Sequence, residues 1–409
     1  MRVCGDRAAG RTGRLTSMPS PVGRVLITGG GIGGLAAAIA LARRGIASNV
    51  LERSAFEEET GAGIQLGPNA TRVLRHIGVL DAIEQTAFRP EVIWVFDGLS
   101  GRRLASVPLG NHAETRYGAP YLTLHRADLH AAFLAVAERL DLIALMPRFE
   151  VSSIAADDAG IAAQSADGSR TTGSCLIGAD GLWSAVRMQV APHAALRFAG
   201  ATASRALVSR KGLPPPFDAP VVGLWLGPGT HLVHYPLRSG ADLNVVAVTE
   251  GGHERQGWNQ AADTRMLRAS FTGWCKDSKS LLECAGAWRS WSLYRLAAIT
   301  PWSTGRTVLL GDAAHPVLPF LAQGAGLAIE DAVALASNLA SLPRDPATAF
   351  ARYAEERQHR AWRVQREARL LGRLYHLGGP ARLARNFVLG RRSEAGLLAS
   401  FDWLYGETR

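Results

Sequence analysis

RVLITGGGIGGLAAAIALARRGIASNVLER, residues 24–53, is the stretch that decides the fold of this chain. Its apolar start and its end, ASNVLE, are typical of strands, and the uncharged part between them is typical of a helix. Gly29, Gly31 and Gly34 have the spacing G-x-G-x-x-G. In that spacing the first glycine allows a tight turn, the second admits a pyrophosphate, and the third lets helix and strand pack closely. The stretch therefore predicts a dinucleotide-binding βαβ unit.

Two further features of this stretch point to a bound nucleotide. The helix expected to begin near Gly33 would direct its unpaired N–H groups and the positive end of its dipole at the phosphates. Glu52 ends the second strand, where a ribose hydroxyl needs an acceptor. A signal peptide or membrane anchor is the competing interpretation, because residues 25–42 carry no charge and arginines precede them. Five glycines within six positions and the acid-terminated strand favour the βαβ unit.

Size, charge and cysteine content limit the class of protein. The chain has 409 residues, 47% of them hydrophobic, enough for one large or two ordinary domains with a substantial core. Its net charge of +10 comes almost entirely from dispersed arginines, so we expect anionic cofactors or an acidic substrate rather than nucleic acid. Four cysteines without C-x-x-C spacing suit a reducing cytoplasm, and no metal-ligand cluster is visible. The first 23 residues are expected to be disordered, with Met18 as a candidate start and a transit peptide as the alternative.

Along the chain, segments that mix helices and strands alternate with segments that are rich in strands. Helical spacing follows Pro68, a hairpin is predicted within residues 91–109, a helix within 126–139 and a three-stranded meander within 149–177. Residues 200–300 are rich in strands, and a long helix is expected from Asp345, with Glu356 and Arg360 paired on it. We therefore predict an α/β protein with a discontinuous Rossmann-like domain, an inserted β-sheet-rich substrate domain and C-terminal helices. The expected parts are a disordered extension (1–23), the nucleotide-binding domain (24–90, 126–199 and 303–342), the substrate domain (91–125 and 200–302) and a helical region (343–409).

Three motifs occur in a fixed order: GGGIGG with Glu52, GADGLWSAVR (residues 178–187) and GDAAHPVLPFLAQGAG (residues 311–326). Together they resemble the single-component FAD-dependent aromatic monooxygenases, the family that includes 3-hydroxybenzoate 6-hydroxylases and salicylate hydroxylases. The C-terminal DWLYGE is similar to the end of that group. Flavin halogenases have a related fold with a W-x-W-x-I-P segment, but Trp288 and Trp291 have the spacing W-x-x-W, so packing is the expected role of these tryptophans.

The resemblance implies FAD as the cofactor and NADH or NADPH as a transient co-substrate. It places Glu52 on the adenosine ribose, Arg53 near the adenine and Arg126 on the phosphates or ribityl chain. Asp180 would serve the FAD and NAD(P)H pyrophosphate region, and Asp312 would bind the ribityl hydroxyls. The helix that starts at Gly324 and Ala325 would face the pyrimidine edge of the flavin, where its N–H groups stabilise the reduced anion. The cofactor-binding residues expected are Gly29, Gly31, Gly34, Glu52, Arg53, Arg126, Asp180, Asp312, Gly324 and Ala325.

The chemistry implied is hydroxylation of a small phenolic or heteroaromatic acid with O₂ through a C4a-hydroperoxyflavin. The protein must then supply a dry site and a group that takes the phenol proton. His231 and Tyr235, in HLVHYPL, resemble the pair that flanks substrate in relatives. On a strand they point to one face, about 13 Å apart, with His234 facing away. His315 is expected to shape its loop, and Gln65 to lie near substrate.

Alternatives remain open at the level of the sequence. They are a hydroxylase of a larger polyketide or antibiotic-type substrate, a flavin reductase, and a non-catalytic flavin-binding protein. The expected partners are the aromatic substrate and O₂, with no nucleic acid and no integral membrane segment. The oligomeric state is left open, with a homodimer as a candidate. The sequence singles out no arginine as the anchor for a substrate carboxylate.

Overall fold

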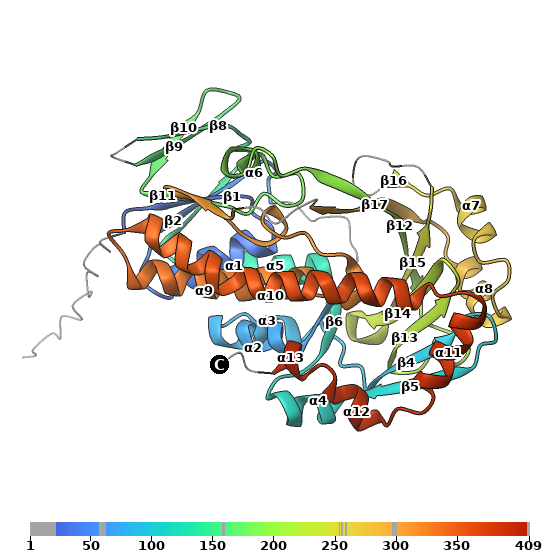
Figure 1. The fold of residues 1–409 in the computed structure, drawn as a ribbon. Helices are drawn as coiled ribbons and strands as arrows, with labels where there is room; N and C mark the ends of the chain where they lie inside the picture. Colours follow the sequence, from blue (N-terminus) through green and yellow to red (C-terminus); the bar gives the residue numbers. More distant parts are fainter. Residues whose placement is uncertain are drawn as a thin grey trace, which may run out of the picture.

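A computed structural model describes residues 22–56, 63–157, 160–252, 254, 257, 260–296 and 301–406. Two large sheets stand at opposite ends of an elongated molecule, and one long helix, α10 (Pro346–Tyr375), runs along both of them (Figure 1). The expectation of a disordered N-terminal extension concerns residues 1–21, which lie outside the described residues.

The first sheet has six strands, and five of them are parallel. Their order is β18 (Ser303–Thr304), β19 (Thr307–Leu309), β11 (Cys175–Gly178), β1 (Val25–Thr28), β2 (Ser48–Glu52) and β7 (Ile143–Pro147). Only β18 pairs antiparallel. The central strands are covered on both faces, which is why they read as continuous apolar runs such as VLIT and CLIG. This arrangement confirms the predicted Rossmann-like α/β fold.

Helices pack on this sheet and on one another. The glycine turn leads into α1 (Ile32–Ala42), which packs between α5 (Arg126–Ala137) and α9 (Gly324–Ser341), and α10 packs on α9. Residues 25–42, weighed above as a membrane segment, therefore form β1 and α1 in the largest hydrophobic core. Within the described ranges, the search for a helix long and apolar enough to cross a membrane found none.

A small antiparallel meander interrupts the first domain where the sequence predicted it. Its strands are β8 (Val151–Ala156), β9 (Ile161–Ser165) and β10 (Arg170–Gly173), in the order β10-β9-β8. The chain then enters β11 of the parallel sheet. In Figure 1 the meander projects at the top left, away from the second sheet.

The second sheet has eight strands drawn from two distant parts of the chain. Their order is β16 (Gln260–Ala261), β17 (Arg289–Leu296), β12 (Leu196–Ser209), β15 (Asp242–Glu250), β14 (Thr230–Leu237), β13 (Val221–Gly227), β4 (Val92–Asp97) and β5 (Arg103–Pro108). The hairpins predicted around residues 97–102 and 238–241 are present as β4–β5 and β14–β15. A parallel pairing of β13 with β4 joins the two parts of the chain.

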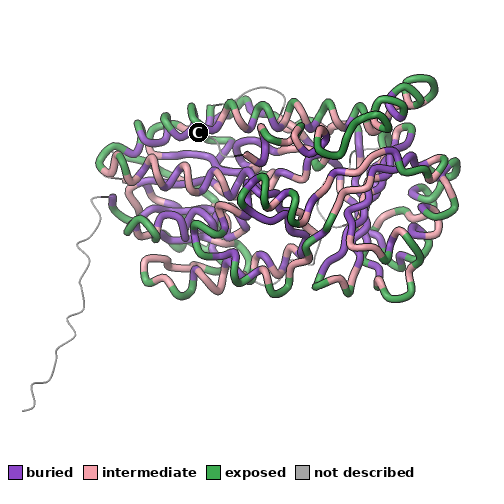
Figure 2. Tube along the Cα trace, turned by 90° about the horizontal axis from the view of Figure 1, so that it is seen from below, coloured by how far each residue is buried: buried purple, intermediate pink, exposed green. Residues whose placement is uncertain are grey.

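The two faces of this sheet have different neighbours. Helices α7 (Thr264–Ala269) and α8 (Lys276–Cys284) cover one face over a core that includes Trp225, Phe271 and Trp274. The other face lies against the two-stranded sheet of β3 (Gly63–Leu66) and β6 (Leu122–His125) and against the loop that precedes α9. Figure 2 shows that the strands are mostly buried and that exposed residues lie on the outer helices and loops. A site between the sheets would thus be enclosed by strands and covered by helices.

The remaining helices are short. They are α2 (Pro68–Ile77), α3 (Leu80–Glu84), α4 (Gly110–Tyr117), α6 (Ala185–Val190), α11 (Gly379–Leu389), α12 (Glu394–Ala399), α13 (Asp402–Tyr405) and the 3₁₀ turns η1 (Arg238–Gly240), η2 (Gly311–Ala313) and η3 (Pro319–Leu321). The helix predicted after Pro68 is divided into α2 and α3 because Gly78 takes a left-handed conformation, with φ of 78°.

The long helix α10 begins as predicted but is paired differently. Asp345 accepts a hydrogen bond from the Thr348 N–H (3.1 Å), with Pro346 at the first helical position. The expected Glu356–Arg360 pair is wrong. Arg360 instead binds Glu330 of α9 (2.5 and 2.7 Å), because that carboxylate is nearly buried and needs a cation.

Candidate active site

The three sequence motifs meet at one edge of the parallel sheet. Residues Thr28, Leu51, Gly178 and Leu309 lie side by side at the carboxyl ends of β1, β2, β11 and β19. Each motif begins within a few residues of this row. The carboxyl edge of an open parallel sheet is where such folds bind their ligands. The three motifs, far apart in the sequence, thus form neighbouring loops at one edge of the sheet.

The glycine turn has the geometry that the spacing predicted. Gly29 has φ of 99°, and a Cβ atom at Gly34 would lie 1.9 Å from the Gly29 carbonyl oxygen, so the close approach of α1 to β1 excludes a side chain there. A Cβ at Gly31 would meet nothing within 4 Å. Gly31 is the N-cap residue of α1 and makes no side-chain hydrogen bond, so the first N–H groups of the helix have no capping side chain. These N–H groups are suited to a phosphate.

Glu52 holds the glycine turn in place. Its carboxylate accepts hydrogen bonds from the Gly30 N–H (2.6 Å) and the Ser54 N–H (2.9 Å). His130 of α5 donates to the Gly30 carbonyl oxygen (2.8 Å) from the other side. Arg53 is exposed next to Glu52 at the end of β2. The structure places both residues beside the turn, and their contacts with ribose and adenine stay predictions.

Asp312 lies just beyond β19, close to three basic side chains. Burial raises the pKa of its carboxyl, and the charges of His315, Arg126 and Arg187 act against that rise. Arg126 is the first residue of α5. Gly324, which begins α9, lies so close that a Cβ there would be 4.0 Å from Asp312 Oδ1. The helix start at Gly324 and Ala325 has no side-chain cap, as the prediction of an N–H-rich end requires.

Asp180 and Arg187 connect the second motif to the third. Asp180 Oδ2 accepts a hydrogen bond from the Val186 N–H (3.1 Å), and Arg187 donates to the Ala313 carbonyl oxygen (3.0 Å). The other carboxylate oxygen, Oδ1, is buried and has no hydrogen-bond partner in the described part of the chain. Burial also raises the pKa of the Asp180 carboxyl. An acceptor without a donor indicates that a ligand completes this site.

These features fit FAD. The uncapped start of α1 and the open space at Gly31 suit the pyrophosphate, and the second start, at Gly324, suits an electron-rich ring edge. Asp180 Oδ1 and the Asp312 carboxylate are acceptors for hydroxyl groups. Together the motifs can bind a long, anionic, hydroxyl-rich nucleotide along the sheet edge.

A buried network of charged side chains supports the carboxyl edge of the parallel sheet, and the sequence did not predict it. Asp331 of α9 is fully buried and accepts hydrogen bonds from His315 Nε2 (2.5 Å) and Arg357 Nε (2.7 Å). Burial raises the Asp331 pKa, but His315 and Arg357 outweigh burial and leave it below its ordinary value. His315 therefore shapes its loop, as predicted, by tying it to α9. Adjacent acids in the apolar run LAIEDAVALA are the signal that could have revealed the network.

His231 and Tyr235 lie on the same face of β14, the face toward the flavin motifs. His231 is buried, and its ring contacts those of Phe320 (5.4 Å between centroids), Tyr375 (5.5 Å) and His376 (5.0 Å). Phe320 belongs to the loop that runs from Asp312 to the start of α9. His234 faces the other way, against Phe217 and Trp225, as its parity predicted.

Tyr235 lies against a different part of the site. A Cβ at Gly63 would be 2.7 Å from its ring, and Gly63 begins the strand that carries Gln65. Gln65 accepts a hydrogen bond from Tyr121 (2.7 Å). His231 and Tyr235 thus face the same side but have separate neighbours, as the spacing predicted. Burial lowers the pKa of His231 and raises that of Tyr235, so it favours the neutral form of both side chains.

The C-terminal helices add aromatic groups that the sequence did not assign. The Tyr405 ring lies against Gly67, where a Cβ would be 2.6 Å from it, and makes edge contact with Tyr117 and Tyr121. Trp288 and Trp291, in contrast, pack in the sheet as predicted. Tyr405 of the C-terminal motif therefore covers the segment that follows β3.

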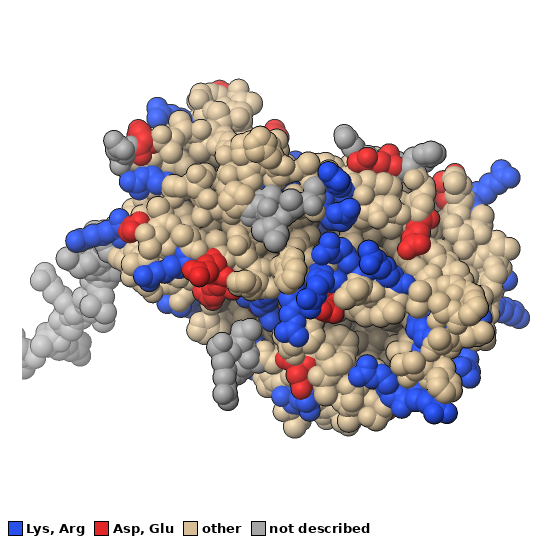
Figure 3. All heavy atoms as spheres, in the orientation of Figure 1, with Lys and Arg blue, Asp and Glu red and all other residues tan. Residues whose placement is uncertain are grey.

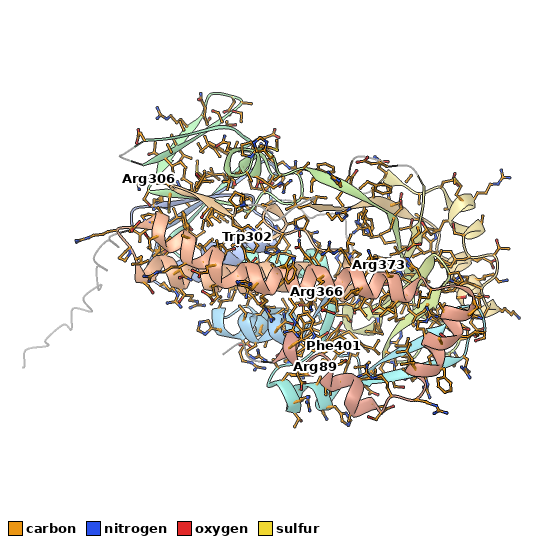
Figure 4. The ribbon with its side chains drawn as sticks, in the orientation of Figure 1. Arg89, Trp302, Arg306, Arg366, Arg373 and Phe401 are labelled. Carbon is orange, nitrogen blue, oxygen red and sulfur yellow. The ribbon has the colours of Figure 1, made fainter. Side chains whose placement is uncertain are left out.

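A separate cavity of about 440 Å³ opens on the outer side of the third motif. His315, Pro316, Trp302, Arg295 and Arg369 line part of it, and none of the expected FAD contacts does. Lys and Arg side chains gather over the middle of the face seen in Figure 3, and Figure 4 labels Arg366 and Arg373 on α10, the helix that contributes Arg369 to the cavity. Such a face attracts anions, which suits a dinucleotide reductant.

The fold and the sheet edge define a flavin-binding α/β protein with a second, aromatic-lined sheet facing the flavin site. The chain belongs to the FAD binding domain family, whose model matches residues 23–368. This match confirms the resemblance drawn from the motifs, and the chain is an FAD-dependent enzyme of the aromatic hydroxylase type.

Characterised relatives span nearly the whole chain. The 3-hydroxybenzoate 6-hydroxylase of Polaromonas naphthalenivorans (strain CJ2) is 36% identical over 93% of this chain and 95% of its own length. A 3-amino-4-hydroxybenzoate 2-monooxygenase of Streptomyces platensis is 37% identical over 94% and 96%. A solved structure, Klebsiella pneumoniae HpxO complexed with FAD and uric acid, has a TM-score of 0.82 and 26% identity, covering 94% of this chain and 97% of that one.

Proposed function

We propose that the enzyme uses NAD(P)H and O₂ to hydroxylate a small phenolic or heteroaromatic acid. The observation that carries the proposal is the contact between His231 and Phe320, since it puts a neutral buried base against the loop that begins at Asp312. The relatives act on 3-hydroxybenzoate, 3-amino-4-hydroxybenzoate and 6-hydroxynicotinate, all of them hydroxylated aromatic acids.

The residues of this chain would divide the work as follows. When bound, FAD supplies the activated oxygen. His231 accepts the proton of the substrate hydroxyl, which makes the ring more nucleophilic. Tyr235 remains protonated and donates a hydrogen bond to the substrate. The buried sheet face excludes water, which protects the reactive oxygen species from decay.

Purified, FAD-loaded enzyme should oxidise NADH or NADPH faster when a suitable acid is added, and should form hydroxylated product in equal amount. The panel is 3-hydroxybenzoate, salicylate, 3-amino-4-hydroxybenzoate and 6-hydroxynicotinate. His231→Gln should reduce the hydroxylation rate about 10²–10⁴-fold with unchanged FAD content. Tyr235→Phe removes the hydroxyl proposed to donate to the substrate and should also slow hydroxylation. Tyr353→Phe, which removes a buried hydroxyl from the FAD-domain core, is its matched control. An unaffected rate in His231→Gln would refute its assignment as the base.

The alternatives predict other results in the same assay. A hydroxylase of larger antibiotic-type substrates would respond to none of the small acids, and a flavin reductase would release all reducing equivalents as hydrogen peroxide. A non-catalytic flavin-binding protein would bind FAD but show no stimulated oxidation. The identity of the relatives over the whole chain supports the small acids.

Three further assignments stay proposals. A cytoplasmic location is supported by the use of NAD(P)H, which cells hold in that compartment. The division at residues 91, 126, 200 and 303 is supported by the separate sheets, and limited proteolysis would test it. A homodimer is supported by exposed apolar side chains on α10 and α11, and sedimentation would test it.

A further inference from the structure

A chain of hydrogen bonds leads from His231 to the protein surface. His231 Nδ1 lies 2.7 Å from His376 Nε2, and His376 Nδ1 lies 2.7 Å from Glu250 Oε1. The His376 side chain is 3% exposed, whereas that of Glu250 is 53% exposed. Two buried imidazoles therefore connect a base on the flavin-facing side of the sheet to a carboxylate in water.

The charge of Glu250 dictates which nitrogens carry protons. A carboxylate only accepts hydrogen bonds, so His376 Nδ1 must donate to it and His376 Nε2 must then be bare in the neutral ring. His231 Nδ1 must in turn donate to that bare nitrogen, which leaves His231 Nε2 as an acceptor. Among the described residues, the hydrogen bond found for the His231 ring is the one from Nδ1 to His376. One surface charge thus fixes the buried base in the form that can accept a proton.

We propose that His231, His376 and Glu250 form a proton relay that carries the substrate's hydroxyl proton to solvent. This inference rests on the function proposed above. The substrate O–H bond breaks as an N–H bond forms at His231 Nε2. The Nδ1 proton of His231 moves to His376 Nε2, and the Nδ1 proton of His376 moves to Glu250, which releases it to water. Each electron pair stays on the atom that loses the proton, and the reverse transfer to the product oxygen restores both imidazoles.

The surroundings explain why His231 needs such a path. Burial, and then the nearby His376, lower the His231 pKa well below its ordinary value, so the protonated form of His231 is disfavoured. Its other neighbours are Phe320 and the Tyr375 phenol. Around His376 the charged groups are Glu250 and Arg385. Burial lowers the His376 pKa, Glu250 raises it and Arg385 lowers it further. Glu250 is the one carboxylate that the described residues place on this path.

The backbone holds the relay rigid. The Gly229 N–H donates to the His376 carbonyl oxygen (3.0 Å), and the Glu250 N–H donates to the Gly229 carbonyl oxygen (2.8 Å). Gly229, in the β13–β14 turn, thus binds the backbone of both His376 and Glu250. Because α10 ends at this turn, the end of the helix sets the position of His376. His376 and Glu250 are accordingly positioning and relay residues, and His231 is the group expected to touch substrate.

The first test measures tautomers and needs no turnover. ¹⁵N NMR of histidine-labelled, FAD-loaded full chain should show both rings neutral and protonated at Nδ1, with His231→Gln and His376→Gln assigning the signals. Glu250→Gln should release this preference, because its amide can donate as well as accept. Protonation of either wild-type ring at Nε2 would overturn the relay even if no substrate were known.

The second test measures single-turnover hydroxylation of 3-hydroxybenzoate, or of whichever acid in the panel is turned over. Glu250→Gln and His376→Gln should slow this step at pH 7 on the order of tenfold or more, with unchanged substrate Kd and rate of flavin reduction. The rate should recover as pH rises toward the phenol's own pKa, and imidazole should restore His376→Ala. Asp242→Asn, an acid at the opposite end of β15, is the matched control.

The two tests separate the relay from the proposed function. Wild-type pH profiles in both Glu250→Gln and His376→Gln, with product formed, would overturn the relay and leave the function intact. Slow variants that neither high pH nor imidazole rescues would also overturn it, because they would indicate a structural role only. Lack of hydroxylation by wild-type enzyme across the panel would refute the proposed function. The tautomers of His231 and His376 would still show whether the hydrogen bonds of the relay run in the proposed direction.

Discussion

Replacing Gly34 by alanine tests the link between a glycine spacing and a binding site. In the structure the new Cβ would lie 1.9 Å from the Gly29 carbonyl oxygen, whereas real Cβ contacts stay beyond 3.0 Å. Helix α1 must therefore move from β1 by about 1.1 Å. Overpacking of this kind costs about 1–3 kcal/mol, and the helix preference of alanine offsets at most about 1 kcal/mol of it. We expect Gly34→Ala to lower both the stability of the flavin-free protein and its affinity for FAD.

Gly31→Ala is the matched control, because the same methyl group would meet nothing within 4 Å and Gly31 has φ of −73°. Urea unfolding of flavin-free Gly31→Ala should match wild type, since no native contact is disturbed. Its FAD affinity, measured by quenching of flavin fluorescence, should nevertheless fall, because the methyl occupies the place where the phosphate approaches the helix. Wild-type stability in flavin-free Gly34→Ala, or wild-type FAD affinity in Gly31→Ala, would refute the reasoning.

Two buried carboxylates should respond to amide substitution in opposite ways. Asp331→Asn should cost about 3–5 kcal/mol at pH 7, because it leaves Arg357 short of a partner. The Asp331 pKa is lowered in the folded state, so the loss of unfolding free energy in Asp331→Asn should be complete above pH 3.8 and should shrink as pH falls through the lowered pKa. An equal loss at all pH values would contradict this. Asp180 has a raised pKa, so its ionisation costs stability as pH rises through that pKa. Flavin-free Asp180→Asn should be at least as stable as wild type at pH 7 but should bind FAD more weakly. Thermal melts and FAD titration measure the two effects, and a lower melting temperature or an unchanged FAD affinity would contradict the prediction.

Much of the flavin half could be predicted because its signals are local. The βαβ unit is contiguous, the spacing of Gly29, Gly31 and Gly34 follows from sterics, and each motif directly follows an apolar strand. Parallel strands have their carboxyl ends at one edge, so the convergence of the three motifs followed once the strands were recognised. Strand parity likewise placed His231 and Tyr235 on one face and His234 on the other.

Interactions between distant segments could not be predicted in the same way. The Glu356–Arg360 pair is favoured by helix spacing alone, yet a nearly buried Glu330 on another helix attracts Arg360 more strongly. Local periodicity carries no information on which helices pack together. The same holds for Asp331, whose partners His315 and Arg357 come from separate elements.

The sequence by itself determined the fold class, the row of nucleotide-binding loops and the face of β14 that His231 and Tyr235 share. Those features depend on backbone sterics and on periodicities within single segments. Only the tertiary structure brought His376 to His231, 145 positions away, and set Glu250 at the end of the path. The physical reason is that burial and hydrogen bonding depend on which surfaces meet, and the packing of α10 across both sheets decides this.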